Sequence, residues 1–141
     1  MVADVSQRIV VGIDGSEGSY QALEWAAAYA EETGRAVHAI CAWEYPASYG
    51  FYVGEGVWDL GASSRVMAEE QVAKAQEQHP AARIDLEVVE GHPGQVLVEA
   101  SEGASLLVVG CRGRGGFVGM LLGSTSTHCV HASACPVLVC R

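Results

Sequence analysis

The sequence predicts a single α/β domain in which helices cover both faces of a parallel sheet, and three observations support this class. Five short apolar runs alternate with longer helical stretches along the 141 residues, as in a chain of β-α-β units. The first and fourth runs are almost entirely aliphatic, as expected of strands buried on both faces. Half of the residues are hydrophobic and 18% are charged, which suits one compact core and excludes a disordered chain.

The predicted elements alternate along the chain, and most are bounded by a residue that caps or ends them. Residues 14–16 are the predicted turn and N-cap of the first helix, which Gly34 ends. Pro80 ends the second helix, and Pro93 suits the first turn of the third. We predict strands over 8–13, 36–43, 84–89, 106–109 and 136–140, and helices over 17–33, 64–78, 93–103 and 124–134.

The third predicted strand differs from the first and fourth because its apolar residues alternate with polar ones. Ile84, Leu86 and Val88 alternate with Asp85 and Glu87. Alternation of this kind indicates that one face of the strand is solvated. We therefore expect this strand near an edge of the sheet.

Residues 44–63 have no apolar period and are rich in glycine and tyrosine, so we predict a long loop. Its aromatic side chains are suited to close over a ligand or meet a partner. They are equally suited to fill the space above the sheet edge, and the sequence leaves both interpretations open. The aromatic residues of this segment and its start are Trp43, Tyr45, Tyr49, Phe51, Tyr52 and Trp58.

The charge of the chain is acidic and unevenly distributed. Eight basic and 17 acidic residues give a net charge of −9, which argues against binding to nucleic acid or to anionic membranes. The segment from Gly103 onward has no acidic residue and carries Arg112, Arg114 and Arg141. Its cationic character makes it the region best suited to a small anion.

We predict the cellular location of the protein from the targeting signals that the sequence does not show. The first residues do not resemble an export signal, and no apolar run reaches the length of a membrane span. The five cysteines form no Cys-x-x-Cys pair. We therefore expect a cytoplasmic protein with reduced thiols.

Two loops that follow predicted strands carry residues suited to a ligand. Residues 12–16 follow the first strand and residues 110–119 follow the fourth. In open parallel sheets, ligands bind beyond the carboxyl ends of the strands where the winding reverses. The order along the chain does not by itself place these two loops side by side.

The second loop and the helix start after it are suited to phosphate. Glycines let backbone amides approach an anion, and the hydroxyl-rich helix start at 123–126 adds free amides and a favourable dipole. Arg112 and Arg114 add positive charge. The alternative is a flexible glycine loop with solvated arginines. A P-loop is excluded because the only lysine, Lys74, lies within a predicted helix, and neither glycine cluster matches the Rossmann fingerprint.

The glycine spacing Gly110-x2-Gly113-x9-Gly123-Ser124 resembles that of ATP-binding universal stress proteins. The runs at 10–16, 106–110 and 135–139 resemble the same family, so the likeness covers essentially the whole chain. It implies a sheet of order 3-2-1-4-5, with strands one and four adjacent and ATP between them. It also implies a stress-response function exerted through the nucleotide-bound state.

The resemblance also implies roles for individual residues. Ile13 and Asp14 would border the nucleotide, with the Asp14 carboxylate near the ribose or a phosphate-bound metal such as Mg²⁺. The backbone of Ala42 would face the adenine. Such proteins often pair their last strands in a homodimer, here through residues 137–140, and many have Ser where this chain has Cys111. The residues implied to hold ribose and phosphates are Gly110, Arg112, Gly113, Gly123, Ser124 and Thr125.

Other interpretations of these residues stay open. Asp14 is also suited to cap a helix and nothing more. A cluster formed by His128, His131, Cys129 and Cys135 hints at a metal, although its spacing favours ordinary packing. No constellation for efficient catalysis is present, which leaves slow ATP hydrolysis through Asp14 and a metal as the enzymatic alternative. The alternative from another class is a nucleotide-independent interaction or ligand-carrier module that uses the 44–63 loop.

Overall fold

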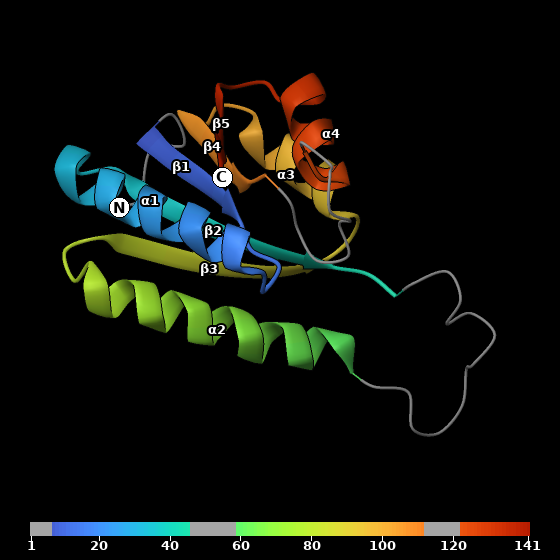
Figure 1. Ribbon diagram of the computed structural model, residues 1–141, viewed down its shortest axis with the longest axis horizontal. Coiled ribbons are helices and arrows are strands. Elements are labelled where there is room, and N and C mark those ends of the chain that lie inside the picture. Colours follow the sequence, from blue (N-terminus) through green and yellow to red (C-terminus); the bar gives the residue numbers. More distant parts are fainter. Residues whose placement is uncertain (1–6, 46–58, 112–121) are drawn as a thin grey trace.

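The computed structural model describes residues 7–45, 59–111 and 122–141, which form a five-stranded parallel sheet with helices on both faces (Figure 1). The strand order is β3-β2-β1-β4-β5, which confirms the predicted fold class and the order that the resemblance implied. In chain order the elements are β1 (Arg8–Gly12), α1 (Glu17–Thr33), β2 (Ala36–Trp43), α2 (Leu60–Gln78), β3 (Arg83–Glu90), α3 (Pro93–Ser101), β4 (Leu106–Gly110), α4 (Ser124–Ala132) and β5 (Val137–Cys140).

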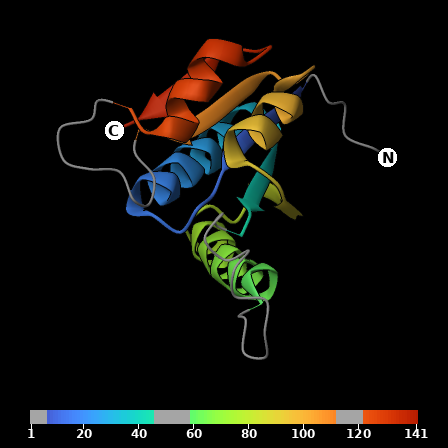
Figure 2. The ribbon, with the colours of Figure 1, turned by 90° about the vertical axis from the view of Figure 1, so that its right-hand side faces the viewer.

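The helices form two layers, one on each face of the sheet (Figures 1 and 2). α1 and α2 pack on one face, and α3 and α4 pack on the other. Each helix layer packs on the sheet around a separate hydrophobic cluster. Leu23 of α1 belongs to the first cluster, and Leu97 of α3 and Cys129 of α4 belong to the second. β1 and β4 contribute to both clusters, so their middle residues are buried.

α1 shows how local sequence signals produce the first layer. The Ser16 hydroxyl accepts a hydrogen bond from the Ser19 amide at 3.1 Å and caps the helix. Gly34, at a φ of 74°, ends it in the left-handed conformation that favours glycine. The buried face is mostly alanine, which lets the helix lie close to the sheet. Within the described ranges, no helix is both long and apolar enough to cross a membrane.

Three helix boundaries differ from the predicted ones, since α4 also ends early, at Ala132 rather than at residue 134. α2 begins at Leu60 rather than at residue 64, because the Asp59 carboxylate caps it by accepting from the Ala62 amide at 3.0 Å. A Cβ added to Gly61 would lie 2.7 Å from the Trp43 ring, so this first turn packs tightly on the end of β2. α3 ends at Ser101, two residues early, and Gly103 has a φ of 78°.

The register places the carboxyl ends of β1 and β4 side by side. Val11 pairs with Val108 across these two strands, and Gly12 pairs with Ile40 on the other side of β1. The loop after β1 and the loop after β4 therefore leave the same edge of the sheet from adjacent strands. The juxtaposition that chain order alone left open is a feature of the fold.

Candidate ligand-binding site

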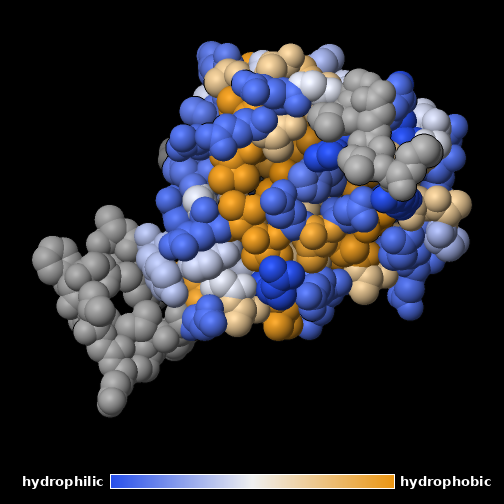
Figure 3. All heavy atoms as spheres, turned by 180° about the vertical axis from the view of Figure 1, so that it is seen from behind, coloured by the Kyte–Doolittle hydropathy of each residue, from blue (hydrophilic) through white to orange (hydrophobic). Residues whose placement is uncertain are grey.

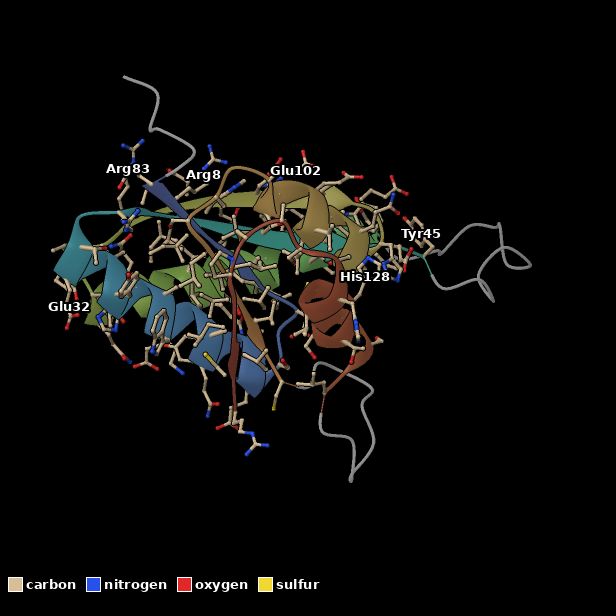
Figure 4. All side chains as sticks on the ribbon, turned by 90° about the horizontal axis from the view of Figure 1, so that it is seen from above. Arg8, Glu32, Tyr45, Arg83, Glu102 and His128 are labelled. Carbon is tan, nitrogen blue, oxygen red and sulfur yellow. The ribbon has the colours of Figure 1, made fainter. Side chains whose placement is uncertain are left out.

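The winding of the chain reverses between β1 and β4. β1 leads into α1 on one face of the sheet, whereas β4 leads toward α4 on the opposite face. Such a reversal is where open α/β sheets form a crevice beyond their strand ends. Tyr45 and His128 lie toward this end of the molecule, away from Arg8 and Arg83 at the amino ends of the strands (Figure 4). The candidate site is therefore built from the residues that follow β1, β2 and β4.

Asp14 is held by the turn that starts α1. One of its carboxylate oxygens, Oδ1, accepts from the Ser16 amide at 2.9 Å and from the Ser16 hydroxyl at 2.5 Å. The Asp14 amide donates to the Ser19 hydroxyl at 3.2 Å. The intervening Gly15 has a φ of 85°, which favours glycine, and a Cβ there would lie 3.2 Å from the Met67 side chain. These contacts fix the orientation of the carboxylate before any ligand arrives.

The Asp14 carboxylate also lies near the end of β2. Burial, and then the negative charge of Asp14, raise the pKa of the Cys41 thiol. Cys41 is buried in the cluster under α1 and α2. The carboxylate thus lies near the carboxyl ends of both β1 and β2.

Ile13 and Ala42 take different positions at this edge. The Ile13 side chain is only 3% exposed and belongs to the core, and its amide donates to the Ile40 carbonyl at 2.9 Å. Ala42 lies two residues beyond Ile40, so its amide and carbonyl point to the same side of β2 as the Ile40 carbonyl does. This is the side on which β1 runs, but β1 has already ended at the level of Ala42. The amide and carbonyl of Ala42 therefore face the space beyond the end of β1.

Gly110 is required by packing. A Cβ at this position would lie 2.7 Å from the carbonyl carbon of Gly18 and 2.8 Å from its oxygen. These are backbone atoms of the first turn of α1 and cannot move aside as a flexible side chain would. Any side chain at residue 110 would therefore separate the end of β4 from the start of α1.

The start of α4 is joined to the end of β4 through Cys111. Its carbonyl accepts from the Gly123 amide at 2.6 Å and from the Ser126 hydroxyl at 2.9 Å, and its amide donates to the Cys140 carbonyl at 2.7 Å. Gly123, the N-cap residue, offers no side chain to the first turn of the helix. Ser124 is exposed and Thr125 half-buried. The α4 N-terminus thus presents amides, hydroxyls and a positive dipole end suited to an anion.

The structure brings together most of the predicted site residues. Those after β1, β2 and β4 and at the start of α4 share one edge of the sheet, whereas Arg112 and Gly113 lie outside the described residues. Ser19 and Ser126 were missed as supporting residues. A serine three positions after a helix cap was the available signal for both, because a hydroxyl there can reach the turn before the helix.

The histidine and cysteine cluster suggested by the sequence packs as ordinary structure. Burial, with a smaller contribution from Cys135, raises the pKa of the Cys129 thiol to about 11. The His128 ring packs against Gly94 and makes an edge contact with the His92 ring, with centroids 6.2 Å apart. Across residues 7–45, 59–111 and 122–141, no three His, Cys, Asp or Glu side chains are grouped as a metal would need.

The fold and this edge define a doubly wound α/β protein whose strand ends at the switch point carry groups suited to a small anionic ligand. The profile of the Universal stress protein family matches residues 6–141, and the chain belongs to that family. Two universal stress proteins of Mycobacterium tuberculosis are 38% and 36% identical to it over 144 and 139 residues, each aligned with 94% of this chain. The chain spans about half the length of the curated relatives it matches, 44% and 45% in these two cases.

Solved structures show the same fold. Universal stress protein UspA from Lactobacillus plantarum superposes with a TM-score of 0.78 at 18% identity, and all of both chains is covered. A universal stress protein solved in complex with cAMP is 29% identical, with a TM-score of 0.66 and 96% of each chain covered.

Proposed function

We propose that this protein binds an adenine nucleotide, ATP in the first instance, and acts in the stress response through its nucleotide-bound state. The observation that carries the proposal is the start of α4, where Gly123 supplies no side-chain cap, at the same edge of the sheet as the Asp14 turn and the outward-facing backbone of Ala42. A 29% identical member of the family was solved with cAMP, which supports adenine nucleotides as the ligand class.

Each part of the crevice fits one part of such a ligand. The Ala42 backbone is suited to the edge of the adenine, and the Ile13 and Gly110 backbones line the end of β1 and β4 beside the ribose. Ser124 and Thr125, with the amides that follow Gly123, are suited to the phosphates. Arg112 and Gly113 remain predicted phosphate contacts. The Asp14 carboxylate is suited to hold a ribose hydroxyl or a phosphate-bound Mg²⁺.

The same geometry favours binding over catalysis. The Asp14 carboxylate is the proposed catalytic group, and its Oδ1 is already held by the amide and hydroxyl of Ser16. We therefore propose at most slow hydrolysis of ATP. Phosphate release by wild type and by Asp14→Asn tests this, and equal rates would dismiss Asp14 as a catalytic residue.

Thermal unfolding with and without Mg-ATP tests the binding proposal. Protein freed of nucleotide should melt roughly 5–10 °C higher when ATP is present at about 100 times its Kd. Ser124→Glu should abolish this shift without destabilising the free protein, because a carboxylate at the start of α4 favours the helix dipole but repels phosphate. Mass spectrometry of the nucleotide that co-purifies identifies the ligand.

Val130→Glu is the matched control. It adds the same charge to an exposed position of the same helix, away from its start. Its ATP shift should equal that of wild type. The absence of any ATP response in nucleotide-free wild type would contradict the proposal, and an unchanged response in Ser124→Glu would remove α4 from the site.

We also propose that the protein forms a homodimer and is located in the cytoplasm. β5 pairs with β4 on one side, and its four residues Val137–Cys140 are all half-exposed and uncharged. A short apolar edge of this kind is suited to pair with the same strand of a second copy. The cytoplasmic location stays a prediction from the sequence.

A further inference from the structure

An aromatic pair lies on the flank of α1 that is turned away from α2. The rings of Trp25 and Tyr29 stack with centroids 5.1 Å apart, and Trp25 is 40% exposed. Tyr20 occupies the opposite flank of the helix, facing α2, where the Lys74 ammonium lies 4.4 Å from the centre of its ring. The helical spacing therefore turns the stacked pair away from α2 and toward the β5 side of the sheet.

The sheet next to this pair is apolar and incompletely covered. On this face α2 packs on β2 and β3, and α1 packs mainly on β1 and β4. Leu138 and Cys140 of β5 belong to the partly buried residues at the margin of this cluster, as do Leu106 and Tyr29. Together with Trp25, which stacks on Tyr29, they make up the surface that we call the α1–β5 flank.

Strand pairing alone is too small to hold two copies together. β5 has four residues, whereas a stable interface involves about 20–30 residues and about 800 Å² on each side. Further surface must be buried near β5. Exposed aromatic rings are the side chains most often found at the centre of such interfaces.

We propose that the α1–β5 flank is the side-chain part of a homodimer interface and that Trp25 of each copy covers the joined β5 strands. The proposal rests on the β5 pairing put forward above. A two-fold axis beside β5 brings the same flank of both copies to one face of the joined sheet, so the occupant of each flank is the second copy of this chain.

The spacing of the elements fits this arrangement. With strands about 4.8 Å apart, a helix centred over β1 and β4 lies about 10 Å from the axis, so the two α1 axes are about 19 Å apart. Helices about 10–12 Å across leave a gap of about 8 Å between them. Indole rings extending from both sides narrow this gap above Leu138 and Cys140, which strand pairing would otherwise leave open to water.

Sedimentation equilibrium over a concentration series tests the proposal with wild type and two matched variants. Trp25→Glu should raise the dimer dissociation constant at least tenfold, whereas Trp25→Phe should keep most of the affinity. Val66→Glu, which charges a 56% exposed apolar residue of α2 far from β5, should stay within twofold of wild type. Thermal unfolding of each variant confirms that it is folded.

The outcomes separate this proposal from the ones on which it rests. If Leu138→Lys dissociates the dimer but Trp25→Glu associates like wild type, the flank is not part of the interface and strand pairing stands. If wild type is monomeric throughout the series, both the flank and the β5 pairing are wrong. ATP binding is measured separately by the melting shift and is unaffected by either result.

Discussion

The two edge strands of the sheet, β3 and β5, are opposites in charge and exposure. Exposed residues alternate with half-buried ones along most of β3. The exposed residues are Arg83, Asp85, Glu87 and Glu90. β5 is Val-Leu-Val-Cys, with every residue half-exposed and none charged. Charged side chains along an open edge discourage pairing with another chain, whereas an uncharged edge permits it. The difference favours the proposed association at β5 and disfavours pairing at β3.

The surface on the side of β3 reflects this difference. β3 and β5 lie on opposite sides of the molecule (Figure 2). Seen from behind, on the β3 side, hydrophobic surface is interspersed with hydrophilic side chains (Figure 3). Apolar surface is therefore present on the β3 side as well, and the hydrophilic side chains among it distinguish this side from the uncharged β5.

A hydrogen-bonded row fixes the charges near β3. A guanidinium nitrogen of Arg8 lies 3.0 Å from Nδ1 of His38, and Nε2 of His38 lies 2.9 Å from a carboxylate oxygen of Glu87. Since a guanidinium can only donate, Nδ1 accepts, the ring proton is on Nε2, and His38 is neutral. The row connects β1, β2 and β3 across the sheet.

The largest effect is expected from a charge on β5. Leu138→Lys should convert the proposed dimer to monomer, raising the dissociation constant by more than about 100-fold, because a buried unpaired ammonium opposes pairing. Leu86→Lys is the control, since Leu86 occupies an equivalent half-buried position on β3 beside the same cluster. It should lower stability without changing the dimer. Sizing with light scattering measures both, and an unchanged mass for Leu138→Lys would contradict the comparison.

An intermediate effect is expected when β3 loses its charges. The double variant Asp85→Val with Glu87→Val should associate beyond the dimer as its concentration rises, because it gives β3 an uncharged edge like that of β5. Light scattering over a concentration series is the measurement. Asp85→Asn with Glu87→Gln, which keeps the edge polar, should associate much less. If neither variant associates, charge is not what protects β3.

The smallest effect is expected from pH. Burial, and then the positive charge of Arg8, lower the pKa of His38 below 6.5, although Glu87 partly opposes the shift. The unfolded chain therefore binds a proton more readily than the folded one, so this residue lowers the free energy of unfolding as the pH falls below about 6.5. His38→Gln should flatten the fall measured by denaturant unfolding between about pH 7 and pH 5.

The control for the pH experiment is His131→Gln, which removes an exposed histidine of α4. It should leave the pH profile as steep as that of wild type. An equally steep profile in His38→Gln would show that the row beside β3 does not contribute to acid sensitivity.

Much of the fold was predictable because its signals are local. The aliphatic runs of β1 and β4, the Ser16 cap and the left-handed Gly34 each depend on a few neighbouring residues. The first turn of α2 was not predictable in the same way. Residues 60–63 have little helical pattern, and their conformation depends on the Asp59 cap and on contact between Gly61 and Trp43.

The features of the candidate site also divide into those that local sequence predicts and those that depend on tertiary packing. The Asp14 turn and the start of α4 were predictable from short motifs, and the structure places both at one edge. The interlock of Gly110 with Gly18 was not predictable, because it depends on how closely β4 approaches a helix from the other end of the chain. The anchoring of α4 through Cys111 likewise depends on tertiary packing.

The close packing of Gly110 against Gly18 changes how the glycine at position 110 should be interpreted. Because the space beside it is filled by the backbone of Gly18, selection for a stable junction between β4 and α1 is enough to retain a glycine there, with or without a nucleotide. A related chain that bound no nucleotide would still need Gly110, whereas Ser124, whose side chain is exposed, would be free to change. Among related chains, the hydroxyl at the start of α4 is therefore the more informative record of ligand binding.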